Sequence, residues 1–207
     1  GRYYAAYFNG GKKADLGFFD PNDNSYWVSL STGSGFNAPY SGQWIAPNTF
    51  GHAGGRYYTG DFNDDGSEDL GYFEPANNSF HLNMSNGESF WNSGTGEWVA
   101  PGTFGHAGGR YYVGDFNGDD KTDLGFFDPG DSSFHVNLST GSGFGKPGSG
   151  RWVAPGNFGH PGGEYYIGNF DGDLKGTSDL AFFEPSNRSF HVWLSTGSGF
   201  GAKGSGQ

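Results

Sequence analysis

The stretch GRYYVGDFNGDDKTDLGFFDP, residues 109–129, decides the fold because the chain contains four versions of it. The other three are GRYYAAYFNGGKKADLGFFDP from Gly1, GRYYTGDFNDDGSEDLGYFEP from Gly55 and GEYYIGNFDGDLKGTSDLAFFEP from Gly163. The starting points are 54 residues apart, and the offset becomes 56 after two extra residues between Asp173 and Asp179. A repeat of this length is typical of solenoids, propellers and repeat arrays.

Each repeat reads as a set of short strands with no helix. In the third repeat the strand-like runs are Arg110–Phe116, Asp123–Phe127, Ser133–Ser139 and Trp152–Ala154. In the run 133–139, Phe134, Val136 and Leu138 alternate with polar residues, which predicts one buried face. Four short strands per repeat describe a propeller blade. We therefore predict an all-β fold of four tandem propeller-type blades, each with about four antiparallel strands.

The repeats divide the chain into residues 1–54, 55–108, 109–162 and 163–207. Three of them end in a similar tail: QWIAPNTFGHAG from Gln43, EWVAPGTFGHAG from Glu97 and RWVAPGNFGHPG from Arg151. The fourth stops at Gln207, before its own tryptophan, so we expect it to be incomplete and to lack the last strand. Either the chain is a piece of a larger ring, or copies complete one another by donating strands.

Composition excludes several classes of function. A net charge of -11 and a pI near 4.7 argue against binding nucleic acid or an anionic membrane surface. No apolar stretch approaches the roughly 18 residues of a membrane span, so we expect no membrane insertion. Apolar content is only 33% while aromatic content is 19%, which predicts an aromatic core. The absence of cysteine removes disulfides and thiolate chemistry.

Acidic loops in the second and third repeats predict calcium sites. Carboxylate or amide side chains stand at loop positions 1, 3, 5 and 9, and a backbone carbonyl at position 7 would complete the oxygen shell that calcium prefers. The predicted ligands are Asp61, Asn63, Asp65, Asp69 and the Ser67 carbonyl in one loop, and Asp115, Asn117, Asp119, Asp123 and the Lys121 carbonyl in the other. The alternative is that Asp, Asn and Gly simply form tight turns here.

The outer repeats depart from this pattern. The fourth offers Asn169, Asp171, Asp173 and Asp179, with a longer gap before the last ligand. The first has Tyr7, Asn9, Gly11 and Asp15 at these positions, with Lys12 and Lys13 beside them. We expect a site in the fourth repeat and none in the first.

The motifs DFNGDDKTDLGFF and DFNDDGSEDLGYF resemble the FG-GAP or VCBS repeat family, known from integrin α-chains and from secreted proteins, and the resemblance covers nearly the whole chain. It implies a calcium-binding β-propeller, usually of seven blades, with calcium in the loop that joins the first two strands of a blade. It also implies a secreted, extracellular or cell-surface location. Some similar proteins, the Psathyrella velutina-type lectins, bind sugars between blades, and others are accessory domains of polysaccharide-degrading enzymes.

Two repeated sets of aromatic and imidazole side chains are candidates for sugar binding, which needs an aromatic platform and fixed polar groups. The tails carry Trp44, Trp98 and Trp152, and the third strands carry His81, His135 and His191. For the tryptophans, packing within the core is the alternative. The tail histidines His52, His106 and His160 read as a turn or packing feature of the blade.

Four Asn-x-Ser sequons, at Asn77, Asn83, Asn137 and Asn187, predict glycan attachment in a eukaryotic secreted protein. Glycans on Asn83 and Asn137 would exclude a sugar pocket on the same strand face.

No residue set breaks the repeat symmetry in the way that catalysis requires, so we expect no enzymatic activity. The carboxylates Asp20, Glu74, Asp128 and Glu184 recur before proline and read as turn residues. We predict an extracellular, calcium-stabilised module that binds carbohydrate or mediates adhesion, with glycans or matrix and cell-surface molecules as partners. The alternatives are a self-assembling fibre or sheath protein, and a non-catalytic domain of a secreted polysaccharide-degrading enzyme.

Overall fold

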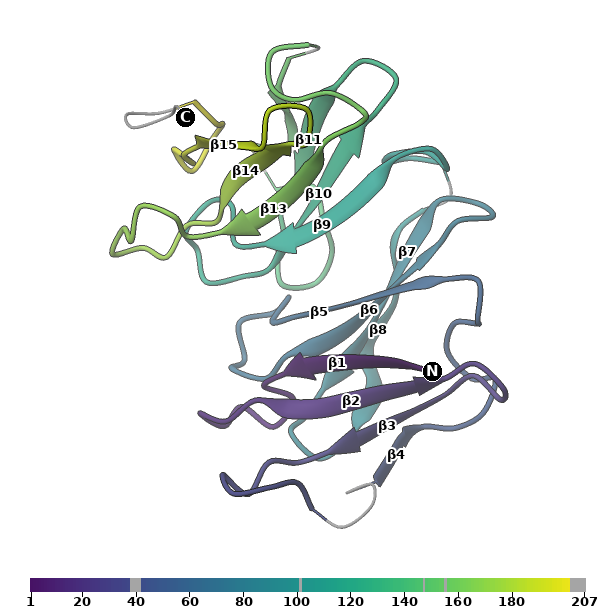
Figure 1. The fold of residues 1–207 in the computed structure, drawn as a ribbon. Helices are drawn as coiled ribbons and strands as arrows, with labels where there is room; N and C mark the ends of the chain where they lie inside the picture. Colours follow the sequence, from purple (N-terminus) through teal and green to yellow (C-terminus); the bar gives the residue numbers. More distant parts are fainter. Residues whose placement is uncertain (38–41, 101, 147, 155, 202–207) are drawn as a thin grey trace. The chain divides into compact units, whose positions relative to one another are not determined.

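The structure is a computed structural model that describes residues 1–37, 42–100, 102–146, 148–154 and 156–201, and in residues 91–95 the backbone alone (Figure 1). The described residues form strands and turns and contain no helix, so none that could span a membrane. The strands are β1 (Arg2–Ala6), β2 (Asp15–Asp20), β3 (Ser25–Ser29), β4 (Gly42–Ile45), β5 (Arg56–Gly60), β6 (Asp69–Glu74), β7 (Ser79–Ser85), β8 (Phe90–Val99), β9 (Arg110–Gly114), β10 (Asp123–Asp128), β11 (Ser133–Asn137), β12 (Gly150–Val153), β13 (Glu164–Gly168), β14 (Asp179–Glu184) and β15 (Ser189–Trp193).

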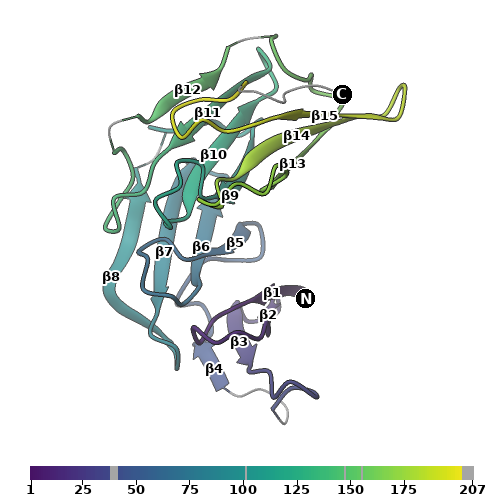
Figure 2. The ribbon, with the colours of Figure 1, turned by 90° about the vertical axis from the view of Figure 1, so that its left-hand side faces the viewer.

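One antiparallel sheet falls in each repeat, and its strands are hydrogen-bonded in chain order. The orders are β1-β2-β3-β4, β5-β6-β7-β8, β9-β10-β11-β12 and β13-β14-β15. Figure 2 shows β8, the longest strand, at the edge of its sheet. The prediction of an all-β fold with propeller-type blades of about four antiparallel strands is confirmed.

The chain divides into two compact units, Gly1–Thr103 and Phe104–Gln207, each with two sheets. Within the units, β1 lies beside β5, and β13 beside β9. The boundary cuts the second repeat before its FGH tail, because that tail packs on the following blade. The Phe104 ring lies 6.0 Å from the Phe126 ring, and the His106 ring lies 5.2 Å from it.

Each unit has an aromatic core between its two sheets, as the composition predicts. In the first unit Phe8, Tyr26 and Trp44 are buried against Tyr57 and Phe90 of the second repeat. The matching core of the second unit contains Phe116, Phe134, Trp152, Tyr165 and Phe182. Burying an aromatic side chain removes about 150–250 Å² from water, so these rings supply most of the driving force for packing.

Two sequence features explain how a blade accommodates these rings. In β11 the alternation holds, since Phe134, Val136 and Leu138 are buried while His135 and Asn137 are half-buried. In β10 a Cβ atom on Gly125 would lie only 2.7 Å from the Phe134 ring, so glycine is needed for the ring to lie across the strand.

Candidate binding pockets and acidic loops

The tail of one repeat and the strands of the next form a pocket that recurs along the chain. One pocket, of about 310 Å³, is lined by Thr49, Phe50, Gly51, His52, Tyr72, Glu74 and His81. Another, of about 300 Å³, is lined by Asn157, Phe158, Gly159, His160, Phe182, His191 and Trp193. Both are at the lower end of the usual range for small-molecule sites, about 300–1,000 Å³.

The tail histidine is held in one tautomer by its own turn. His52 Nδ1 accepts a hydrogen bond from the Gly54 amide at 3.1 Å, so Nε2 carries the hydrogen and points it at the Glu74 carboxylate. His160 repeats this arrangement, with Nδ1 accepting from Gly162 at 3.2 Å and Nε2 contacting Glu184. The tail histidine is thus the turn residue that the sequence indicates, and it also places an imidazole at the pocket.

The tail of the second repeat makes the matching contact between its histidine and a carboxylate. His106 Nε2 lies 3.0 Å from Asp128 Oδ1. In the sequence, the tail histidines and the carboxylates before proline read as separate turn features. In three successive cases a tail histidine is followed at a similar distance in the sequence by a carboxylate before proline. This shared spacing is the signal that could have predicted contacts between the two residue types.

The strand histidines are also fixed in one tautomer. Ser79 Oγ donates its single hydrogen to Asn77 Oδ1 at 2.7 Å, so His81 Nε2, at 2.8 Å, must be the donor to that serine oxygen. A neutral His81 therefore keeps Nδ1 as an acceptor. His191 has the same partners, with Ser189 Oγ at 3.0 Å from its Nε2.

An aromatic ring lies between the two histidines of each pocket. The Tyr72 ring centroid is 5.6 Å from that of His52 and 6.3 Å from that of His81. Phe182 is placed in the same way, 5.2 Å from His160 and 6.5 Å from His191. The pocket of the second repeat therefore combines an aromatic ring, two imidazoles and the Glu74 carboxylate. In the fourth repeat the Glu184 carboxylate contacts the His160 side chain that lines the pocket.

The carboxylates remain ionised because hydrogen bonds stabilise their charge. Ser186 and His160 lower the pKa of Glu184 to about 2. For Glu74, burial acts to raise the pKa, but hydrogen bonds from the Ala76 amide, His52 and Tyr72 outweigh it, so the pKa is lowered. Each pocket therefore presents a permanent acceptor at neutral pH.

The tail tryptophans do not line these pockets. Trp44 is 7% exposed and Trp152 is 8% exposed, and both lie in the aromatic cores. Trp98 is half-buried, with its ring 6.3 Å from the buried Phe62. The burial of Trp44 and Trp152 favours the core-packing alternative over a sugar platform at these two positions. The pocket tryptophan is Trp193, stacked on Phe158 at 4.6 Å.

The sequons fall into two structural groups. Asn77 and Asn187 are exposed at turns, where each side chain accepts hydrogen bonds from the serine two residues later. Asn137 is half-buried, and Asn83 is buried at 8% exposure, which leaves no room for a glycan on that side chain.

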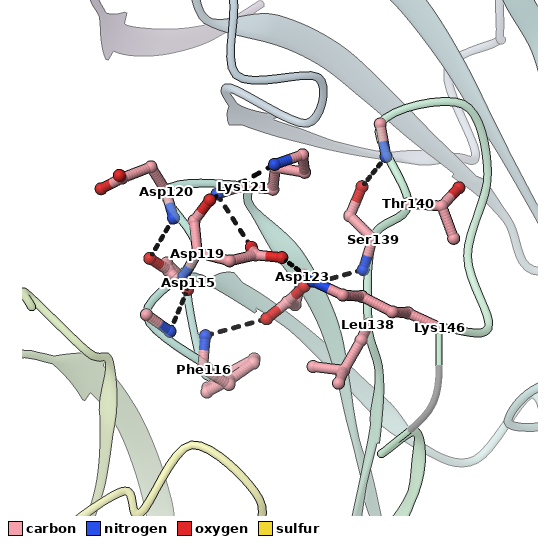
Figure 3. A network of polar contacts seen from close by, with 12 residues as sticks. Asp115, Phe116, Asp119, Asp120, Lys121, Asp123, Leu138, Ser139, Thr140 and Lys146 are labelled. Carbon is pink, nitrogen blue, oxygen red and sulfur yellow. Dashed lines mark hydrogen bonds and ion pairs between the residues drawn. The ribbon is translucent and has the colours of Figure 1, made fainter.

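The acidic loop of the third repeat is closed by its own backbone (Figure 3). Asp115 accepts hydrogen bonds from the amides of residues 118, 119 and 120, and burial raises its pKa. Lys121 donates its amide to Asp119, whose carboxylate also contacts the Lys146 ammonium. The Asn117 Oδ1 atom is buried without a hydrogen-bond partner, which makes it an oxygen available to a cation.

The last acidic residue of each loop ties two strands together. Asp123 is fully buried and accepts from the amides of Phe116 at 3.0 Å and Ser139 at 2.8 Å. Burial, opposed by these bonds, raises its pKa to about 7. Asp69 makes the same two bonds, to Phe62 and Ser85, and burial raises its pKa to about 7 as well.

The outer repeats keep this tie. In the first repeat, Asp15 accepts from Ser31 at 2.8 Å although the other loop acids are missing. In the fourth, Asp179 accepts from Phe170 and Ser195 despite the longer loop, and Asp173 binds Thr177. The aspartate at this position thus has a structural role in all four repeats.

The predicted calcium ligands include asparagine amides and backbone carbonyls beside the carboxylates. Across the described ranges, no group of three or more acidic or histidine side chains is placed to hold a metal. In the second repeat Asn63 donates to Asp65, and Asp61 accepts from the amides of residues 64, 65 and 66. Calcium binding by these loops stays a prediction, which the unpartnered Asn117 Oδ1 supports.

Comparisons with known proteins place the fold near a lectin. A solved structure of an Agrocybe aegerita lectin, which recognises non-reducing terminal N-acetylglucosamine, superposes with a TM-score of 0.72 at 19% identity, over 98% of this chain and 51% of the lectin chain. The Photorhabdus luminescens Tc holotoxin pore matches with a TM-score of 0.59 at 18% identity, over 96% of this chain and 9% of that one.

No family model and no curated protein matches the chain. The chain spans about half the length of the lectin chain. At these identities the likeness concerns the fold alone.

Proposed function

We propose that this chain is a lectin-like module that binds carbohydrate in the recurring pockets. The observation that carries the proposal is the composite pocket itself, in which an aromatic ring lies between two histidines beside an ionised carboxylate. An aromatic ring suits the apolar face of a sugar, and fixed acceptors suit its hydroxyl groups. The fold likeness to a lectin supports the same conclusion.

The geometry assigns a role to each group. The carboxylate of Glu74 or Glu184 would accept hydrogen bonds from sugar hydroxyls, and the strand histidine would offer Nδ1 as a second acceptor. Because the lectin recognises terminal N-acetylglucosamine, we propose this sugar as the first ligand to test. Three equivalent sites on one chain would multiply a weak single-site affinity for a glycan with several termini.

The test removes the three carboxylates together. A Glu74→Gln, Asp128→Asn, Glu184→Gln triple variant should lose binding to an N-acetylglucosamine oligomer in calorimetry while keeping its folded circular dichroism spectrum. The reason is that Gln and Asn keep a side-chain oxygen that accepts from the tail histidine but lack the negative charge. Asp20→Asn is the matched control, since Asp20 is the repeat-equivalent carboxylate and its contacts in the described structure are to Asn22 rather than to a tail histidine. Unchanged binding by the triple variant, or a wild type that binds no glycan on an array, would refute the proposal.

We further propose that the module acts outside the cell or at its surface without catalysing a reaction, and that calcium stabilises it at the loop of the third repeat. The unpartnered Asn117 Oδ1 supports the calcium site, and Lys146 is the group that a cation would displace from Asp119. Lys146→Ala should therefore raise calcium affinity in a calorimetric titration. Absence of calcium binding at millimolar concentration in both this variant and the wild type would contradict the site.

A further inference from the structure

Within each unit, the second repeat inserts a phenylalanine into an aromatic socket on the first. Phe90 lies 5.7 Å from Phe8, 5.8 Å from Tyr26 and 5.0 Å from Trp44. In the other unit Phe200 takes this place, 5.8 Å from Phe116, 5.7 Å from Phe134 and 5.1 Å from Trp152. The chain thus contains the same contact twice.

A tyrosine and two hydrogen bonds complete this contact. Tyr57 packs on Phe19 at 4.5 Å, and Tyr165 packs on Phe127 at 4.2 Å. In each contact a serine hydroxyl of the second repeat donates to a backbone carbonyl of the first, Ser85 to Phe8 at 2.7 Å and Ser195 to Phe116 at 2.6 Å. In each contact an arginine of the first repeat also donates to a backbone carbonyl of the second, Arg2 to Gly55 at 3.1 Å and Arg110 to Gly163 at 3.0 Å.

In the described structure, the first-repeat residues that correspond to these inserting side chains are exposed. Tyr3 is 68% exposed, whereas its equivalent Tyr57 is 6% exposed. Phe36 is 51% exposed, whereas its equivalent Phe90 is 8% exposed. We call Tyr3 and Phe36 the plug face.

The fourth repeat carries the opposite half, an open socket. Phe170 is 49% exposed and Phe190 is 53% exposed, although the equivalent Phe116 and Phe134 are almost fully buried. A depression of about 530 Å³ opens between them, lined by Tyr166, Ile167, Phe170, Ala181, Phe190 and Val192, which we call the socket face. Large exposed apolar patches of this kind mark interaction sites.

The socket differs from its internal counterparts in a way that keeps it open. Ala181 stands where Gly125 allows Phe134 to lie across its strand. The methyl group of Ala181 occupies the space that the ring takes in the third repeat. The Phe190 ring instead packs beside Phe183 at 4.8 Å, which leaves room for an incoming side chain.

Charge identifies which repeat would fill this socket. In the internal contacts the loops that join the first two strands of successive repeats meet. A Cβ on Gly10 would lie 3.0 Å from the Gly66 carbonyl oxygen, and one on Gly118 would lie 2.9 Å from Thr177. In the fourth repeat, which carries the socket face, the corresponding loop position is Gly172, and the exposed Asp171 lies beside it. In the first repeat, which carries the plug face, the corresponding loop positions are Lys12 and Lys13.

The first repeat is the one whose loop carries adjacent lysines and lacks the acids of the other loops. An acidic loop facing a basic one favours docking and fixes its register. Glu164 stands where the internal contact has Arg110, so the socket departs from the template at this position as well as at Ala181.

We propose that the plug face of one chain docks into the socket face of a second copy, through the same contact that the repeats make inside each unit. Such a head-to-tail contact closes into a ring when the rotation permits. Two copies joined by two such contacts form the closed dimer, and together they equal the length of the Agrocybe aegerita lectin chain, of which one copy covers 51%.

Sedimentation with EDTA present, which removes any effect of calcium, tests the dimer. The wild type should have a mass of about 44 kDa, twice the 22.1 kDa of one chain. Phe36→Asp and Phe190→Asp should each be monomeric and keep the wild-type circular dichroism spectrum, because both side chains are exposed. A wild type that sediments as a monomer at about 100 µM would overturn the proposal. A chain that closed on itself would give that result.

Mixing the two variants tests the head-to-tail direction. The Phe36→Asp chain keeps its socket and the Phe190→Asp chain keeps its plug, so an equimolar mixture should form one intact contact and a heterodimer of about 44 kDa. A Lys12→Glu, Lys13→Glu variant should dissociate at least tenfold more readily, and adding Asp171→Lys to it should restore the dimer. A mixture that stays monomeric, or single variants that still dimerise, overturns the proposed contact.

Discussion

Trp152 and Trp193 give the sharpest test of which tryptophans stabilise the fold and which bind ligand. Trp152 is 8% exposed, packs against Phe116 and Phe200, and donates its Nε1 hydrogen to the Gly148 carbonyl at 3.0 Å. Removing a buried aromatic side chain exposes about 150–250 Å², which at about 25 cal/mol per Å² corresponds to roughly 4–6 kcal/mol. Measured truncations of this kind cost about 3–5 kcal/mol.

We therefore expect Trp152→Ala to lower the free energy of unfolding by about 4 kcal/mol, measured by urea denaturation followed by circular dichroism. Trp152→Phe, which keeps a ring in the socket, should cost about 1–2 kcal/mol. Trp193 is half-buried at the pocket, so Trp193→Ala should cost less stability than Trp152→Ala and should weaken glycan binding at that site.

The outcome that would refute this reasoning is the reverse pattern. If Trp152→Ala kept the wild-type unfolding midpoint and lost glycan binding, the indole would be a binding platform in spite of its burial. Fitting the slope of the denaturation curve together with the midpoint separates a change in stability from a change in the surface exposed on unfolding.

Three further predictions concern the loops and the pockets. Asp15→Ala should cost about 1–2 kcal/mol, because it leaves the Ser31 amide without its acceptor, and the cost measured by urea denaturation should be the same with EDTA or calcium; a cost seen only with calcium would contradict the structural role. If calcium binds, chelation should lower the melting temperature, since each site at ten times its Kd contributes about 1.4 kcal/mol, and an unchanged melting curve would show that the loops are only turns. Burial and then the Arg151 charge lower the pKa of His135 below 6.5, so the contribution of neutral His135 to stability is present above about pH 6.5 and is lost at lower pH, where the unfolded chain takes up a proton more readily. Arg151→Gln should raise the pKa of His135 in an NMR titration, and an unchanged pKa would exclude a contribution from Arg151.

The fold could be predicted because two periods coincide in the sequence. The repeat length gives the number of blades, and alternation such as Phe134 and Val136 around His135 gives the strands and their buried face. Both signals are local in the chain. The assignment of the tails was not predictable from them, because a tail such as that of Phe104 packs on the blade of the next repeat.

The candidate site was predicted only in part for the same reason. The strand histidines were expected in a pocket, but the tail histidine that completes each pocket comes from the preceding repeat, as the contact of His52 with Glu74 shows. Trp44 looked like a platform because the sequence does not reveal which aromatic side chains meet in the core. The role of the last loop aspartate could have been inferred from Asp15, which persists where the other acids are lost.

The assembly of each pocket from two successive repeats bears on how such a chain acquires function during evolution. A single repeat supplies either a tail histidine or a strand histidine with its carboxylate to any one pocket, so it has no complete pocket of its own. The first tandem duplication therefore creates the first pocket, and every later duplication adds one more. Gene duplication in this architecture generates binding valency directly, with no new substitution required.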